Sequence, residues 1–121
     1  MYRIKKETIE SIIIASHNTY PNEFFSLLGG DKKNGIIDEL VVVPATYGRN
    51  FTAIKSWLIP IDSRVMGSVH SHPSPNAYPS MADLSSFTKF GDFHLIAAYP
   101  YDLESIAAFD SGGKQQEFIV V

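Results

Sequence analysis

The chain contains no cysteine among its 121 residues. Disulfide scaffolds, cysteine-ligated zinc fingers and thiol nucleophiles are therefore excluded, and a metal site would have to use nitrogen and oxygen donors. The absence of cysteine fits a reducing compartment, and no signal-peptide pattern precedes the first periodic segment. We therefore expect a cytoplasmic location.

Long apolar runs and blocks of like charge are also missing. The longest apolar runs are far shorter than the roughly 20 residues of a membrane span, so no membrane partner is predicted. The formal net charge is −3, and no basic face is available for nucleic-acid phosphates. The chain is 45% hydrophobic and 19% charged, which is typical of a globular protein with a core. At this length, residues 1–121 are predicted to form one domain.

Hydrophobic periodicity predicts two helices. The first covers residues 4 to about 20 and ends at Pro21, because apolar or small side chains recur on one face. The residues of that face are Ile9, Ile12, Ile13, Ser16 and Tyr20. The second helix begins at Ser80, ends at Gly91 and has Leu84, Phe87 and Phe90 as its apolar side.

Short runs of β-branched and aromatic residues predict the strands. The predicted strands are residues 24–28, closed by Gly29-Gly30, and residues 36–44, 64–72, 93–99, 103–109 and 115–121. A hairpin turn at 110–113 joins the last two, and residues 51–61 fit either a strand or a short helix with a loop. Helices interleaved with a mixed sheet predict a layered α/β architecture.

Two histidines two residues apart end the strand at 64–72. Side chains alternate faces along a strand, so His70 and His72 point to the same side, about 7 Å apart at their roots. Gly67 allows a close backbone approach beneath them. Pro73 then stops the strand. The separation of the histidines lets two imidazoles converge on one metal ion.

A third ligand, Asp83, lies in the first turn of the predicted second helix. Two histidines and one carboxylate leave an open position for a water, which is typical of a catalytic zinc site. The same set can hold iron(II). A simpler interpretation is also open: Ser80-x-x-Asp83 is a capping-box pattern, and paired strand histidines are often polar residues on a solvated face.

Zinc hydrolysis also needs a proton carrier that does not bind the metal. Glu23 is the best candidate, because it stands at the mouth of an apolar strand, where a carboxylate is partly desolvated unless the strand end is open. The simpler interpretation of Glu23, a strand-end charge in water, also stays open. Weaker candidates are Glu39, Glu104 and Glu117. Ser80 has a hydroxyl beside the proposed metal site, which could donate to the oxyanion of a tetrahedral intermediate.

These residues resemble the JAMM (MPN+) metalloprotease family, especially its short archaeal or bacterial single-domain members. The family motif is His-x-His, seven residues, Ser, two residues, Asp, and the spacing from His70 to Asp83 matches it at every position. The upstream family pattern Pro-x-Glu-x-x-Gly-Leu-Leu-x-Gly corresponds to residues 21–30, with Ser26 in place of a glycine. The likeness spans nearly the whole chain.

The resemblance implies that His70, His72 and Asp83 bind one Zn²⁺ ion that carries a water. It also implies that Glu23 acts as general base and then acid, and that Ser80 supports the oxyanion. The implied fold is a layered α/β/α MPN fold, a curved mixed sheet flanked by helices and related to cytidine deaminase. The implied activity is hydrolysis of the isopeptide bond between the tail of a ubiquitin-like modifier and a substrate lysine.

Two other functions stay open at this point. One is a zinc peptidase that processes small peptides or sulfur-carrier precursors, and the other is a metal-free protein-interaction module of the MPN type. Residues 47–57 and 76–78 are candidates for the substrate groove. The oligomeric state is not determined by the sequence, and a homodimer is one option.

Overall fold

The computed structural model describes residues 1–41 and 64–121. The strands are β1 (Tyr2–Ile4), β2 (Phe25–Asp31), β3 (Ile36–Val41), β4 (Val65–His72), β5 (Phe93–Ala98), β6 (Ile106–Phe109), β7 (Gln115–Gln116) and β8 (Phe118–Val120). The helices are α1 (Lys6–Thr19), α2 (Met81–Phe87) and the short 3₁₀ helix η3 (Leu103–Ser105). No helix in the described ranges is long and apolar enough to cross a membrane.

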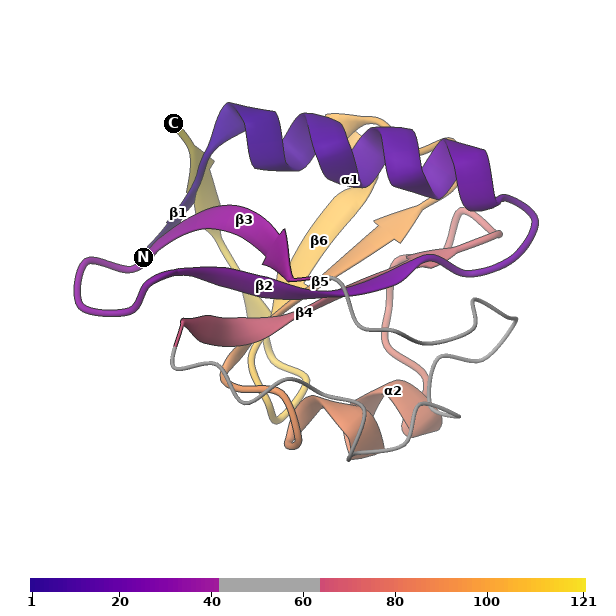
Figure 1. Ribbon diagram of the computed structural model, residues 1–121. Coiled ribbons are helices and arrows are strands. Elements are labelled where there is room, and N and C mark those ends of the chain that lie inside the picture. Colours follow the sequence, from indigo (N-terminus) through magenta and orange to yellow (C-terminus); the bar gives the residue numbers. More distant parts are fainter. Residues whose placement is uncertain (42–63) are drawn as a thin grey trace.

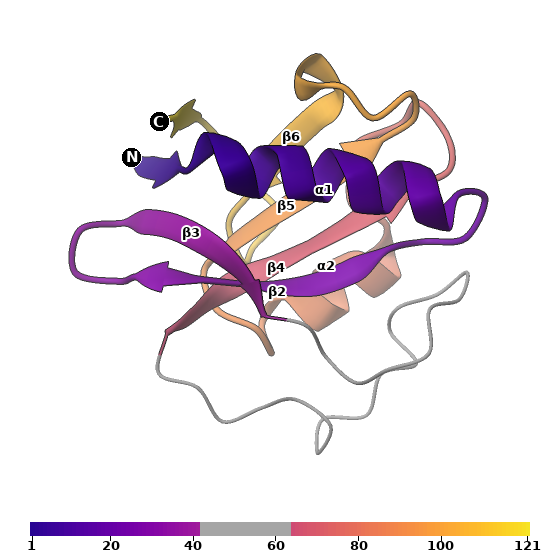
Figure 2. The ribbon, with the colours of Figure 1, turned by 45° about the horizontal axis from the view of Figure 1, so that its top comes forward.

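The strands of the described residues belong to one mixed sheet with the order β7-β6-β5-β4-β2-β3-β1-β8. In the centre of the sheet, β4 pairs antiparallel with β2 and parallel with β5. Helix α1 covers one face and α2 lies against the other, as Figures 1 and 2 show from two directions. The predicted layered α/β/α architecture with a mixed, curved sheet is confirmed.

The curvature of the sheet follows from its two edge strands. β7 and β8 lie at opposite ends of the strand order, yet only Glu117 separates them in the chain. A flat sheet of eight strands would be roughly 30 Å wide, a distance that one residue cannot span. The sheet therefore bends until β8 reaches β1, with which it pairs parallel.

Both faces of the central strands are buried. The main core lies between α1 and the sheet and includes Ile12, Leu28 and Leu95, whereas a second cluster of Phe87, Ile96 and Phe109 lies on the α2 side. Each of the six residues of β5 is buried, because successive side chains point to opposite faces and a helix covers each face.

Gly67 in β4 lies directly against β5, as the sequence predicted. A Cβ atom at this position would lie 1.6 Å from the carbonyl oxygen of Phe93, which is backbone and cannot move aside alone. We expect Gly67→Ala to lower the free energy of unfolding by about 3 kcal/mol in urea denaturation. Gly112→Ala is the control, because the nearest atom there is 3.4 Å away. Equal effects of the two substitutions would contradict this interpretation.

Several predicted boundaries differ from the structure, each for a local reason. β2 continues through Gly29-Gly30 to Asp31, because these residues pair with β3. A Cβ at Gly30 would meet the carbonyl oxygen of Ile36 at 1.9 Å, so only glycine fits there. Residues 2–4 form β1, which is too short to give a periodic signal, so α1 begins at Lys6 and not at residue 4.

Near the C-terminus, the strand predicted at 103–109 begins only at Ile106. Before it, the Asp102 carboxylate accepts hydrogen bonds from the Ser105 N–H at 3.0 Å and the Ser105 hydroxyl at 2.7 Å, which stabilises the 3₁₀ turn. The strand predicted at 115–121 divides at Glu117 between the two edges of the sheet. The hairpin turn at 110–113 is confirmed by the bond from the Asp110 N–H to the Lys114 carbonyl.

Helix α2 ends at Phe87 rather than at Gly91. The N–H groups of Lys89 and Phe90 donate to the carbonyls of Ser86 and Phe87, so the chain tightens after the helix. Gly91 adopts φ 112°, which turns the chain into β5. The predictions for residues 42–44 and 51–61 lie outside the described residues.

His94 of β5 holds α2 against the sheet. Its ring stacks on Phe87 with centroids 4.2 Å apart. Its Nε2 lies 2.9 Å from the Gly91 carbonyl, and its Nδ1 lies 2.7 Å from the Ser68 hydroxyl. Because a carbonyl only accepts, Nε2 carries the proton and Nδ1 accepts from Ser68. Burial lowers the pKa of His94 from 6.5 to about 4.

This lowered pKa makes part of the stability depend on pH. Below pH 6.5 the unfolded chain protonates His94 while the folded chain does not, so stability falls as the pH drops from 6.5 to 4. The loss attributable to His94 is about 3 kcal/mol. We expect His94→Gln to be less stable at pH 7 but to lose less stability between pH 7 and pH 4, measured by urea denaturation. Identical pH dependence of the variant and the parent would contradict the prediction.

Candidate metal centre

Three elements meet at one end of the sheet and carry the predicted site residues. β2 begins beside the end of β4, because the antiparallel register pairs Phe25 with His70. The loop after β4 then leads into α2, whose first turn contains Asp83. Figure 1 shows the end of α1, the start of β2 and the end of β4 on the same side of the molecule. Residues distant in sequence therefore share one site.

His70, His72 and Asp83 converge on one point. The Nε2 atoms of the two histidines are 3.0 Å apart. The Asp83 carboxylate lies 3.3 Å from His70 Nε2 through Oδ1 and 3.1 Å from His72 Nε2 through Oδ2. Tetrahedral zinc with bonds of about 2.0–2.1 Å places its ligand atoms roughly 3.3 Å apart. The donor types and their separations therefore fit a single zinc ion.

Further hydrogen bonds orient the side chains of His72 and Asp83. His72 Nδ1 lies 2.7 Å from the backbone carbonyl of Asn76, so Nδ1 donates its proton there and the lone pair of Nε2 faces the other two ligands. The Ser80 backbone N–H donates to Asp83 Oδ2 at 2.8 Å, and the Asp83 N–H donates to the Ser80 hydroxyl oxygen at 3.1 Å. The capping box is therefore present, and it coexists with the metal-ligand geometry because a carboxylate offers about four lone pairs.

Burial and hydrogen bonds set the charges of the three groups. His70 is fully buried, and burial lowers its pKa. Burial acts to raise the pKa of Asp83, but hydrogen bonds with His70 and His72 outweigh it and hold that pKa well below its usual range. Burial acts to lower the pKa of His72, but hydrogen bonds with Asp83 and the Asn76 carbonyl outweigh it, so the pKa of His72 is raised. A neutral His70 and an ionised Asp83 are the forms that bind metal.

Glu23 and Ser80 line a pocket of about 390 Å³ together with His72 and Asp83. Glu23 is half-buried at the entrance of β2, and its charge acts to raise the pKa of His72. The Ser80 oxygen accepts the cap bond, so its hydroxyl hydrogen can still donate into the pocket. All five predicted site residues therefore lie in one place.

The weaker candidates for a proton carrier lie elsewhere. Glu39 forms an ion pair with Arg64 at 3.1 Å and is exposed. Glu104 is exposed on η3, and Glu117 is the link between the two sheet edges. Among the described glutamates, Glu23 is the one that lines the pocket of the metal ligands.

The segments predicted to line a substrate groove are only partly described. Residues 47–57, with Trp57, lie outside the described residues. Asn76 supports His72 through its backbone carbonyl, which side-chain patterns in the sequence could not reveal. Tyr78 is 68% exposed, and its ring lies 6.4 Å from that of Phe109.

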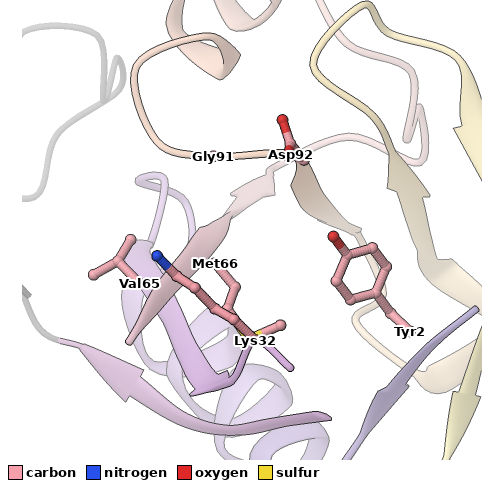
Figure 3. Close-up of a pocket in the computed structure, with 6 residues that line it drawn as sticks. All are labelled: Tyr2, Lys32, Val65, Met66, Gly91 and Asp92. Atoms are coloured by element: carbon pink, nitrogen blue, oxygen red, sulfur yellow. The ribbon is translucent and has the colours of Figure 1, made fainter. Parts of the chain in front are cut away.

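A separate depression of about 270 Å³ lies at the other end of β4. Tyr2, Lys32 and Asp92 line it beside Val65 and Met66, as Figure 3 shows. Met66 and His72 are six residues apart on one strand, so the two places are roughly 20 Å apart. Lys32 and Asp92 are exposed, and the metal-ligand geometry belongs only to the opposite end of the strand among the described residues.

Comparison with known proteins assigns the chain to a family. Residues 5–110 match the family described as prokaryotic homologues of the JAB domain. The chain is 31% identical over 127 residues to a probable metalloprotease of Haloferax volcanii, and the alignment covers 98% of this chain and 78% of that protein.

Solved structures agree with this match. A JAB1/MPN domain protein from Archaeoglobus fulgidus shares 39% identity with a TM-score of 0.80, and the likeness covers 98% of both chains. A structure described as JAMM, a metalloprotease-like zinc site in the proteasome and signalosome, shares 35% identity with a TM-score of 0.79 over 100% of this chain and 98% of that one. A protein from Desulfitobacterium hafniense, at 20% identity and a TM-score of 0.69 over 100% and 93% of the chains, shows the fold alone.

The sequence match, the fold and the geometry of the donor set lead to one conclusion. The structural relatives have JAB1/MPN and JAMM folds, and His70, His72 and Asp83 form a set that fits one zinc ion. The chain belongs to the prokaryotic JAB family of JAMM/MPN metalloprotease-like proteins.

Proposed function

We propose that the protein is a zinc-dependent isopeptidase that hydrolyses the bond between the C-terminal tail of a ubiquitin-like modifier and a substrate lysine. The observation that carries the proposal is that Glu23 shares one pocket with two of the metal ligands, His72 and Asp83. The relative named probable metalloprotease supports peptide-bond chemistry. The ubiquitin-like substrate rests on the resemblance of the motif to the JAMM family.

The chain divides the reaction among five side chains. His70, His72 and Asp83 would hold the zinc ion. Bound zinc would supply Lewis-acid chemistry, lowering the pKa of a water to about 7 and polarising the carbonyl of the scissile bond. Glu23 takes a proton from the attacking water and delivers it to the lysine nitrogen as that nitrogen leaves. Ser80 donates its hydroxyl hydrogen to the carbonyl oxygen as negative charge develops there.

The test is cleavage of a panel of ubiquitin-like conjugates by zinc-loaded protein. We expect hydrolysis directly after the tail, loss of activity with a zinc chelator, and recovery when zinc is added back. Mass spectrometry of the products locates the bond. If no conjugate is cleaved while linear sulfur-carrier precursors or small peptides are, the processing-peptidase function replaces this one.

Metal analysis of protein purified without chelator tests the remaining alternatives. Stoichiometric zinc supports the proposed function, whereas stoichiometric iron would show that the site holds iron(II) in place of zinc. Protein that binds neither metal at neutral pH would favour the interaction module. Several expectations from the sequence stay predictions. They are a substrate protein as the partner, with no nucleic-acid or membrane partner, a homodimer as one option for the oligomeric state, and a cytoplasmic location.

A further inference from the structure

Ser71 lies between the two histidine ligands and connects their strand to the segment just before β2, which contains Glu23 and Phe24. Its hydroxyl oxygen accepts a hydrogen bond from the Phe24 N–H at 2.8 Å, and its own N–H donates to the Phe24 carbonyl at 2.9 Å. We propose that Ser71 is a positioning residue that fixes Glu23 relative to the metal ligands. This inference rests on the proposed function and specifies how the pocket is held in register.

The bond to the hydroxyl departs from an ordinary sheet ladder. In an antiparallel ladder, opposed residues alternate between non-hydrogen-bonded pairs and hydrogen-bonded pairs, and the latter exchange both N–H···O=C bonds through their main chains. At Ser71 and Phe24, one of these bonds uses a side-chain oxygen in place of the main-chain carbonyl. Regular pairing begins one step further in, at Phe25 and His70. The hydroxyl thus keeps Phe24, the residue between Glu23 and the start of β2, bonded to β4.

Burial makes this bond important for the position of Glu23. Ser71 is 0% exposed and Phe24 is 5% exposed, so water cannot readily replace the hydroxyl. If the hydroxyl is removed, the bond that it makes with the Phe24 N–H is lost in a dry site, and we expect the segment at the entrance of β2 to shift. Glu23 precedes Phe24 directly and would move with it. His70 and His72 point to the other face of β4, so their convergence on the metal does not depend on this bond.

The experiment compares two variants of nearly equal shape. Ser71→Thr keeps the hydroxyl, and Ser71→Val replaces it with a methyl group. Amide exchange of Phe24 in the zinc-free protein reports the bond without substrate, and the NMR side-chain resonances of Glu23 report its position. We expect exchange of Phe24 to be about tenfold faster in Ser71→Val than in Ser71→Thr. The Glu23 resonances should shift in Ser71→Val alone.

The kinetic arm uses the zinc-loaded enzyme and a conjugate that the parent cleaves. We expect the kcat of Ser71→Val to be about 10- to 100-fold below that of Ser71→Thr, with KM and zinc content unchanged, because a small displacement of a catalytic group is costly. A merely structural role would lower the melting temperature without moving the Glu23 resonances or the kcat of the folded enzyme. If Ser71→Val does not fold, Ser71→Ala is compared with the parent, because a smaller side chain cannot clash.

If Ser71→Thr and Ser71→Val show the same exchange rate at the Phe24 amide, or the same kcat, the inference is overturned. The exchange and NMR measurements need neither zinc nor substrate. If no ubiquitin-like conjugate is cleaved, the proposed function fails, while these two measurements still decide whether Ser71 positions Glu23.

Discussion

Glu23→Gln is expected to keep zinc bound while lowering kcat by roughly 10²- to 10⁴-fold, the usual contribution of a general base. The amide fills the same space but cannot take a proton from the attacking water. Zinc content should not change, because Glu23 lies in the pocket without belonging to the set of His70, His72 and Asp83. Metal analysis and steady-state kinetics on the same preparation measure the two effects separately.

Glu104→Gln provides the matched control for this substitution. Glu104 is exposed on η3 and is not among the residues that line the pocket, so the same chemical change there should leave kcat within about twofold of the parent. Normal cleavage by Glu23→Gln would show that another group carries the proton. Loss of zinc from that variant would instead show that Glu23 is a ligand.

The second large effect is expected for Asp83→Asn, which should weaken zinc binding on the order of 100-fold or more. The carboxylate is the one anionic donor of the set, and a neutral amide is a poor zinc ligand. Asparagine keeps an oxygen that can accept the Ser80 N–H, so the start of α2 should survive. Competition with a zinc-binding dye at pH 7 measures the affinity, and circular dichroism checks the fold.

The control for Asp83→Asn is Asp92→Asn. It makes the same change in net charge at an exposed carboxylate near the opposite end of β4, beside the depression in Figure 3. Zinc affinity should stay within about twofold of the parent value, because an exposed charge at this distance is largely screened. If Asp83→Asn binds zinc as tightly as Asp92→Asn does, Asp83 is not a metal ligand.

The metal ligands could be predicted from the sequence because their arrangement is mostly local. His70 and His72 share a face through strand alternation, and the capping pattern of Ser80 and Asp83 begins the helix that presents the carboxylate. Gly67 was predictable for the same reason, since a glycine inside a strand often marks a close backbone approach. The proposed isopeptidase function rests on the resemblance to the JAMM family.

Boundaries were less predictable where two local preferences compete. Gly29-Gly30 has the composition of a strand end, but pairing with β3 makes the glycines part of β2. Residues 103–105 directly precede the apolar run of β6, but the Asp102 carboxylate stabilises a 3₁₀ turn there. In each case a contact with a specific atom outweighs the average preference of the residue type.

By itself, the sequence determined the donor types, the spacing from His70 to Asp83 and the exclusion of cysteine chemistry, because these depend on residue identity and on short-range periodicity. Only the tertiary structure decided that Glu23 lines the same pocket as His72 and Asp83 and that Ser71 bonds to the residue next to it. The Ser71–Phe24 hydrogen bond joins residues 47 positions apart. Such a contact depends on the register of β2 against β4 and on the curvature of the whole sheet, which no local pattern encodes.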